Sequence, residues 1–441
     1  MSADAPFRSS PGAASPEPVA STGRVRLVHV LTVPESFLFL RGQLGYMHER
    51  GFELWGISSS GPYQGTIAAL EPITLATVEM PRRITPLADL RAVRALVAAI
   101  RRVRPTIVHA HTPKGGLLGM LAARAVGVPV RVYHMRGLPM LTARGVRRAL
   151  LRWSERIACA CAHRVICVSH SVRAVAVAER LVAADRIVTL CGGSGNGVDA
   201  YGRFAPRPAD RTLRAERRAQ WSLPPDAVVV AFVGRVVRDK GVVELAQAWT
   251  ALRERHPDAH LVIAGAVEPQ DPVPEAVLAG LRGDARVHFL GHADEVRDVY
   301  AAADLIVLPT HREGFPNVPL EAAAMQLPVV STRIPGCVDA VADGRTGLLV
   351  PPGDAEALAG ALGVYLSDPA RRARDGAAGR ARVLAEFDRT RIWEALHAEY
   401  RALLARRAPA ALRSLGAEPT GDGVRRPRAS TGAAAAARGT R

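Results

Sequence analysis

The stretch "HREGFPNVPLEAAAMQLPVV", residues 311–330, follows the apolar run "DLIVLP" and predicts a strand, a turn and a helix. The Gly-Phe-Pro turn ends the strand, and Asn317 is a fair N-cap for the helix. Glu313 then lies at the carboxyl end of the strand, and Glu321 about one turn inside the helix. The free amides of the helix start can bind a phosphate, and the two carboxylates can accept hydrogen bonds from sugar hydroxyls. In the alternative interpretation, Glu321 does no more than complement the helix dipole, and Glu313 is a solvated acid in the loop.

Similar strand-like runs alternate with helical patterns along the whole chain, which predicts an α/β protein with parallel sheets. A segment rich in Gly, Pro and charge, residues 191–226, divides the runs into two sets, each long enough for a doubly wound sheet. We therefore expect two Rossmann-like domains at 24–195 and 196–390, a helix at 391–406 that packs back on the first domain, and disordered tails at 1–23 and 407–441.

The composition fits a globular protein, since 48% of the 441 residues are hydrophobic. No run approaches the roughly 20 apolar residues of a membrane helix, and the first 23 residues lack the apolar core of a signal peptide. The five cysteines form no CxxC pair, which is typical of small buried side chains in a reducing compartment. We expect a cytoplasmic protein.

The positive charge is unevenly distributed. The whole chain carries +17, and residues 24–195, with 24 basic and 9 acidic side chains, carry +15. A membrane surface, a phosphorylated substrate or a nucleic acid would suit such a domain. Its densest part is the segment 142–164, where five arginines lie beside bulky apolar residues: Arg144, Arg147, Arg148, Arg152 and Arg156 with Leu150, Leu151, Trp153 and Ile157. This helix could rest on an anionic membrane, or it could be an ordinary domain helix with a solvated face.

Further cations follow other predicted strands. In "GRVVRDKG" (234–241), Arg235 and Lys240 could neutralise a diphosphate, although an ordinary solvated loop would look similar. In "TIVHAHTPKGG" (106–116), we expect His109 and His111 to point to opposite faces of their strand. As zinc ligands these histidines lack a third partner at the usual spacing.

Together these segments resemble glycosyltransferase family 4, whose GT-B fold pairs two facing Rossmann-like domains, over about residues 26–405. "EGFPNVPLEAAAMQLPVVST" contains the family's E-x7-E signature, and "GRVVRDKG" matches its Arg/Lys loop. The resemblance implies that Glu313 contacts the donor sugar, Glu321 the ribose, and Arg235 and Lys240 the diphosphate. It also implies diphosphate contacts by the backbone of Gly314, Phe315, Pro316, Asn317 and Val318. The family retains anomeric configuration and generally needs no metal, so we expect no cofactor beyond the nucleotide sugar.

The acceptor side departs from the family pattern. "LTVPESFLFLRGQ" replaces the usual glycine pair after the first strand, and the resemblance then implies that Ser36 approaches the acceptor. Arg136 stands where many members have a histidine, and His134, two residues earlier, becomes the expected catalytic histidine. "HTPKGGLLGMLAARAVGVP", with His111 and Lys114, resembles members that build cell-surface polysaccharides on polyprenyl-diphosphate carriers.

We therefore expect a retaining, metal-independent transferase that moves a sugar from a UDP-sugar to a lipid-linked or other saccharide acceptor, peripherally bound to the inner face of the cell membrane. A sugar-nucleotide epimerase of the same fold is one alternative. The other is a non-catalytic basic nucleic-acid-binding protein, which an aromatic content of only 5% disfavours.

Overall fold

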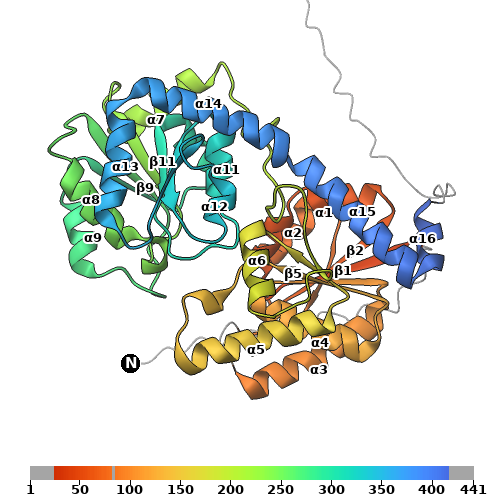
Figure 1. Ribbon diagram of the computed structural model, residues 1–441. Coiled ribbons are helices and arrows are strands. Elements are labelled where there is room, and N and C mark those ends of the chain that lie inside the picture. The colour runs from red at the N-terminus through yellow and green to blue at the C-terminus, as the bar shows by residue number, and fades with distance from the viewer. Residues whose placement is uncertain (1–23, 82–84, 417–441) are drawn as a thin grey trace, which may run out of the picture.

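A seven-stranded parallel sheet with the order β3-β2-β1-β4-β5-β6-β7 forms the centre of the first domain (Figure 1). The computed structural model describes residues 24–81 and 85–416. The strands are β1 (Val25–Val30), β2 (Phe52–Ser58), β3 (Thr74–Thr77), β4 (Ile107–His111), β5 (Val130–Met135), β6 (Arg164–Cys167) and β7 (Ile187–Thr189). Side chains from β1, β4 and β5 are buried on both faces, which explains their nearly continuous apolar sequences.

Helices cover both faces of this sheet. One core is closed by α3 (Pro86–Val103), α4 (Pro113–Val126), α5 (Gly145–Cys161) and α6 (His170–Ala178). The opposite core is closed by the 3-10 helix η1 (Pro34–Leu40), α1 (Gln43–Glu49), α2 (Tyr63–Leu70), α15 (Arg389–Arg407) and α16 (Pro409–Gly416).

The second domain has a six-stranded parallel sheet with the order β10-β9-β8-β11-β12-β13. Its strands are β8 (Val228–Val233), β9 (Ala259–Ala264), β10 (Val287–Gly291), β11 (Leu305–Leu308), β12 (Val329–Thr332) and β13 (Gly347–Val350). Its helices are α7 (Asp210–Gln220), α8 (Val242–Leu252), α9 (Glu275–Arg282), α10 (Val296–Ala302), α11 (Asn317–Ala324), α12 (Cys337–Ala340), α13 (Ala355–Ser367) and α14 (Pro369–Glu386). The prediction of two Rossmann-like parallel domains is confirmed.

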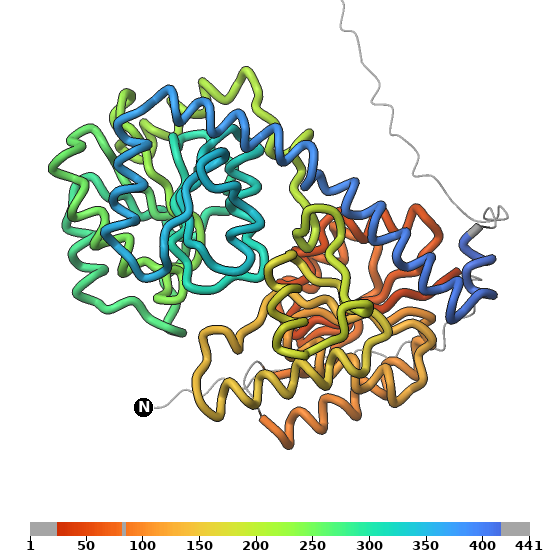
Figure 2. Tube along the Cα trace, viewed as in Figure 1, coloured from red at the N-terminus to blue at the C-terminus, as the bar shows by residue number. Residues whose placement is uncertain are grey.

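The chain crosses between the domains twice, once before α7 and once between α14 and α15 (Figure 2). Trp393 Nε1 donates a hydrogen bond of 2.7 Å to Asn196 Oδ1, which ties the two crossings together. Beyond the second crossing, α15 returns to the first domain and buries Leu396, Tyr400 and Leu404 completely against its sheet. Each such side chain stabilises the packing by roughly 1.5–3 kcal/mol.

The helix α16 corrects the predicted boundary of the C-terminal tail. Residues 409–416 were expected to be disordered, but Leu412 and Leu415 pack beside the first sheet. These leucines give the segment an apolar side. The prediction rested on the Ala- and Arg-rich composition of the whole tail, which does not indicate this local pattern. Residues 1–23 and 417–441, also predicted to be disordered, lie outside the described residues. Within the described chain, no helix combines the length and apolarity needed to cross a bilayer.

Candidate active site

The connection from β11 to α11 builds one wall of the site. The β11 strand is fully buried, and α11 begins at Asn317 with Pro316 in the N-cap position. Asn317 is therefore the first helical residue, and the prediction that it is the N-cap is wrong by one position. Glu313 precedes the helix and Glu321 lies one turn inside it, as the spacing predicted.

Gly314 brings this connection against the first domain. A Cβ atom at this position would overlap the carbonyl oxygen of Arg136, so only glycine allows the two backbones to approach. The Ser169 hydroxyl donates a 2.9 Å hydrogen bond to the Gly314 carbonyl, and the Gly336 amide donates one of 2.8 Å to the Ser171 hydroxyl. The carboxyl ends of the two sheets therefore face each other where the two domains touch.

A cavity of about 220 Å³ lies at this edge between the domains. Its lining combines four cations with two carboxylates: Arg136, Arg235, Lys240, Arg312, Asp239 and Glu313. Lys240 forms a short ion pair with Glu313, and both side chains are largely buried, at 17% and 15% exposed. Because Lys240 contacts Glu313 shortly before α11 begins, this wall can hold an anionic group beside a carboxylate.

A second cavity of about 470 Å³ is lined in part by Asn317 and Glu321 of α11. The Tyr300 hydroxyl donates a hydrogen bond of 2.7 Å to Glu321 Oε2. Burial raises the pKa of Glu321, and this hydrogen bond opposes the rise. Glu321 can therefore offer an oriented oxygen to a polar ligand. Sequence analysis missed Tyr300, although a buried tyrosine hydroxyl generally needs a partner.

The remaining donor-side residues of the prediction take different positions. Arg235 lines the first cavity, is 54% exposed and pairs with Glu268 at 2.9 Å. Phe315 packs its ring against Phe387, with ring centroids 5.5 Å apart, and Val318 packs into the core of the second domain.

The histidines of the first sheet lie differently from the prediction. Successive residues of a strand alternate between its faces, so His109 and His111 share a face, and their ring centroids are 4.1 Å apart. The expectation of opposite faces is wrong. The missing third imidazole comes from β1, because His29 pairs with His109 in the sheet register. His134 lies beside His111 from β5.

Only some of the residues predicted on the acceptor side lie at the cleft between the domains. Of these residues, Arg136 lines the first cavity, with His111 directly behind it. Ser36 lies in η1 and Lys114 pairs with Asp89 at 2.7 Å, and the described linings of both cavities omit these two residues. His134 is 3% exposed and does not line the first cavity, so this arrangement does not support a catalytic contact by its imidazole.

Comparisons with known proteins identify the family of this chain. Residues 40–199 match the family model "Glycosyltransferase Family 4", and residues 227–368 match "Glycosyl transferases group 1". The chain is 31% identical to the capsular polysaccharide biosynthesis glycosyltransferase CapM of Staphylococcus aureus, over 86% of this chain and 97% of that protein. It is 28% identical to an Escherichia coli UDP-Gal:alpha-D-GlcNAc-diphosphoundecaprenol alpha-1,3-galactosyltransferase, over 64% and 71% of the two chains.

Solved structures share the fold. Sucrose-phosphate synthase from Thermosynechococcus elongatus superposes with a TM-score of 0.73 at 22% identity, over 87% of this chain and all of that one. The Anabaena protein HepE in complex with UDP-glucose superposes with a TM-score of 0.70 at 20% identity, over 86% and 99% of the two chains. The predicted GT-B architecture is confirmed.

Proposed function

Because this chain belongs to glycosyltransferase family 4, we propose that it transfers a sugar from a UDP-sugar to a lipid-linked or other saccharide acceptor in cell-envelope polysaccharide synthesis, with retention of anomeric configuration and without a metal. The observation that carries the proposal is the buried Lys240–Glu313 pair at the start of α11, in a cleft between two facing domains. The similarity to CapM and to the diphosphoundecaprenol-dependent galactosyltransferase supports the acceptor class.

The donor fits along α11 from one cavity to the next. Glu321, held by Tyr300, would accept hydrogen bonds from the ribose in the larger cavity. The diphosphate would lie at the α11 amides, where Lys240 and Arg235 neutralise it and stabilise the departing UDP. Glu313 would then exchange its bond to Lys240 for bonds to the sugar hydroxyls. These cations supply the positive charge that a divalent ion supplies in other nucleotide-sugar enzymes.

Hydrolysis of UDP-glucose and related UDP-sugars in the absence of acceptor tests the reaction. We expect slow release of UDP, with the α anomer of the free sugar appearing first in the proton NMR spectrum. Glu313→Gln should reduce turnover by on the order of 10³-fold, as expected when a contact made in the transition state is lost. Glu356→Gln, an exposed carboxylate on α13, is the matched control and should leave turnover unchanged.

The alternatives give different results in this assay and in a nucleic-acid binding assay beside it. An isomerised UDP-sugar without free sugar would indicate an epimerase. Binding of single-stranded nucleic acid without any turnover would indicate a non-catalytic protein. Full activity of Glu313→Gln would contradict the assignment of the site itself.

We also propose that the first domain rests on an anionic membrane through α5. Four large apolar side chains on this helix are exposed, and they recur at helical spacing: Val146, Leu150, Trp153 and Ile157. Arg148 and Arg152 share the carboxylate of Glu179, which leaves their cluster with one net positive charge. Arg144 and Arg147 are exposed and form no ion pair within the described chain.

Vesicle co-sedimentation tests this surface. Each cation near an anionic bilayer contributes about 1 kcal/mol, so the double variant Arg144→Gln/Arg147→Gln should weaken partitioning into phosphatidylglycerol vesicles roughly 30-fold. The double variant Arg255→Gln/Arg282→Gln removes the same charge from exposed positions of the second domain and should bind normally. Equal loss in both variants, or equal pelleting with neutral vesicles, would favour a solvated basic face instead.

A further inference from the structure

Arg136 differs from the other cations of the smaller cavity. Arg235, Lys240 and Arg312 each have a carboxylate partner, respectively Glu268, Glu313 and Asp239. Within the described part of the chain, no carboxylate lies within ion-pair distance of the Arg136 guanidinium, and its Nη2 atom is buried without a hydrogen-bond partner. Arg136 is half-buried, and a buried guanidinium nitrogen without a partner is costly, so this side chain is suited to an anion.

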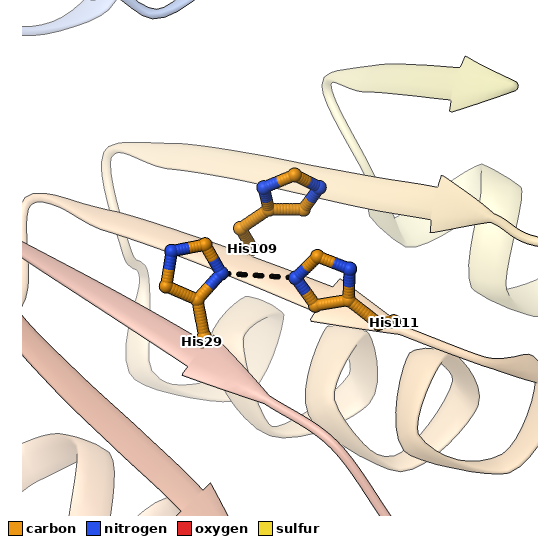
Figure 3. Close-up of side chains that lie close together, drawn as sticks. All are labelled: His29, His109 and His111. Carbon is orange, nitrogen blue, oxygen red and sulfur yellow. Dashed lines mark hydrogen bonds between the residues drawn. The ribbon is translucent and has the colours of Figure 1, made fainter. Parts of the chain in front are cut away.

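Neutral aromatic groups surround this guanidinium. Its Nε atom donates a hydrogen bond of 3.4 Å to His111 Nδ1, and the Phe39 ring centroid lies 5.4 Å from its central carbon. Behind it, His29 and His111 are joined by a hydrogen bond of 2.9 Å, with His109 beside them (Figure 3). Burial lowers the pKa of His29 to about 3 and places the pKa of His111 well below 6.5. These imidazoles are therefore neutral and do not repel the arginine.

The three imidazoles have the composition of a metal site, but their hydrogen bonds oppose one. An arginine can only donate, so His111 Nδ1 accepts, and the neutral ring carries its proton on Nε2, which donates to His29 Nδ1. A metal on His111 Nε2 would require an imidazolate beside a guanidinium. A divalent cation would also be repelled by Arg136. The cluster is better suited to hold Arg136 in place than to bind an ion.

We propose that Arg136 binds a third oxyanion in the cleft, separate from the donor diphosphate and carried by the transferred sugar or by the acceptor. This inference rests on the proposed function, since Arg136 faces the cavity in which Glu313 would hold the sugar. The planar fork of a guanidinium binds a carboxylate or a phosphate through two parallel hydrogen bonds. The ligand is thus a carboxylate on the sugar or a phosphate on the acceptor.

Calorimetry on the full chain distinguishes the two sources. In the donor arm, UDP-glucuronate is compared with UDP-glucose. In the acceptor arm, geranyl diphosphate is compared with geraniol, each titrated into protein saturated with UDP. We expect the wild type to favour the anionic probe in one arm by roughly 10- to 100-fold, the contribution of one charge-assisted contact, and Arg136→Gln to abolish that preference.

Two further variants make the result specific. Arg312→Gln removes a cation of the same cavity that Asp239 already neutralises, and it should keep the preference. Arg136→Lys keeps the charge but loses the fork, so the preference should fall several-fold; this variant decides the matter if Arg136→Gln does not fold. Binding of UDP without an Arg136-dependent preference in either arm would overturn this inference alone. Failure of the wild type to bind UDP would instead overturn the proposed function.

Discussion

Lys240 is the cation whose removal should affect donor binding most. It lies two residues before α8, forms the ion pair with Glu313, and is only 17% exposed. Arg235, the other predicted diphosphate ligand, is 54% exposed and already engaged with Glu268. Water therefore screens Arg235 far more than Lys240. The substitution Lys240→Met removes the charge while it preserves most of the stem.

The expected loss follows from the position of this charge. A unit charge about 4 Å from a phosphate gains about 4 kcal/mol at an effective dielectric constant near 20. Desolvation and the exchange with Glu313 reduce this value, and single charge-assisted contacts contribute about 1.5–3 kcal/mol when measured by mutation. We expect UDP to bind roughly 30- to 150-fold more weakly, which corresponds to about 2–3 kcal/mol.

Removal of Lys240 also leaves Glu313 without its partner, so this carboxylate would repel the diphosphate. The double variant Lys240→Met/Glu313→Gln should therefore bind UDP more tightly than Lys240→Met alone, a non-additive result typical of residues in direct contact.

Isothermal titration of UDP and of uridine into each variant provides the measurement. Uridine has no phosphate, so its affinity should change less than about threefold, while that of UDP falls as calculated. Arg282→Gln, which removes an exposed charge on α9, controls for net charge. Equal losses for UDP and uridine would show that Lys240 shapes the loop instead of neutralising the diphosphate, and the reasoning would then be wrong.

Two further predictions concern stability. Burial raises the pKa of Glu155 to about 7 from its ordinary 4.5, so its contribution to stability is complete below pH 4.5 and is lost as the pH rises through 7. Glu155→Gln, which still accepts the Tyr133 hydroxyl, should remove about 3 kcal/mol of this pH dependence, measured by urea unfolding between pH 4 and 8; an unchanged slope would contradict the raised pKa. Leu404→Ala should cost about 3 kcal/mol because Leu404 of α15 is fully buried against the first sheet, whereas Leu87→Ala, at a 76% exposed position, should cost less than about 0.5 kcal/mol; equal unfolding midpoints would show that α15 does not stabilise the first domain.

The local part of the site was predictable because its determinants are adjacent in the sequence. The turn after β11 and the start of α11 follow from glycine, proline and apolar periodicity, and the seven residues between Glu313 and Glu321 set their separation along the helix. The closeness of Lys240 to Glu313 followed only from the family resemblance. Their segments lie 73 residues apart, and only the pairing of β8 with β11 brings them together.

The histidine cluster shows a different limit. His109 and His111 share a face because residues two apart in a strand point the same way. The prediction of opposite faces contradicted this local rule. His29 lies 82 residues from His111, and its neighbourhood depends on the strand order β1-β4-β5, which no local pattern specifies. A buried hydroxyl from α15 completes the cluster, since the Tyr400 hydroxyl oxygen lies 2.5 Å from His109 Nδ1.

Net charge illustrates the same limit at the level of the domain. An excess of +15 predicts the sign of a partner, but it does not show which cations are free to meet one. In the folded chain, Arg148 and Arg152 share Glu179, while Arg136 lines the cleft with no carboxylate of the described residues within ion-pair distance. An arginine on the surface interacts with water at little cost, but a buried one requires a counter-charge. The net charge therefore cannot distinguish Arg136 from the other arginines. Arg136 is nevertheless the cation most informative about the substrate, because residues 24–81 and 85–416 offer it no carboxylate partner.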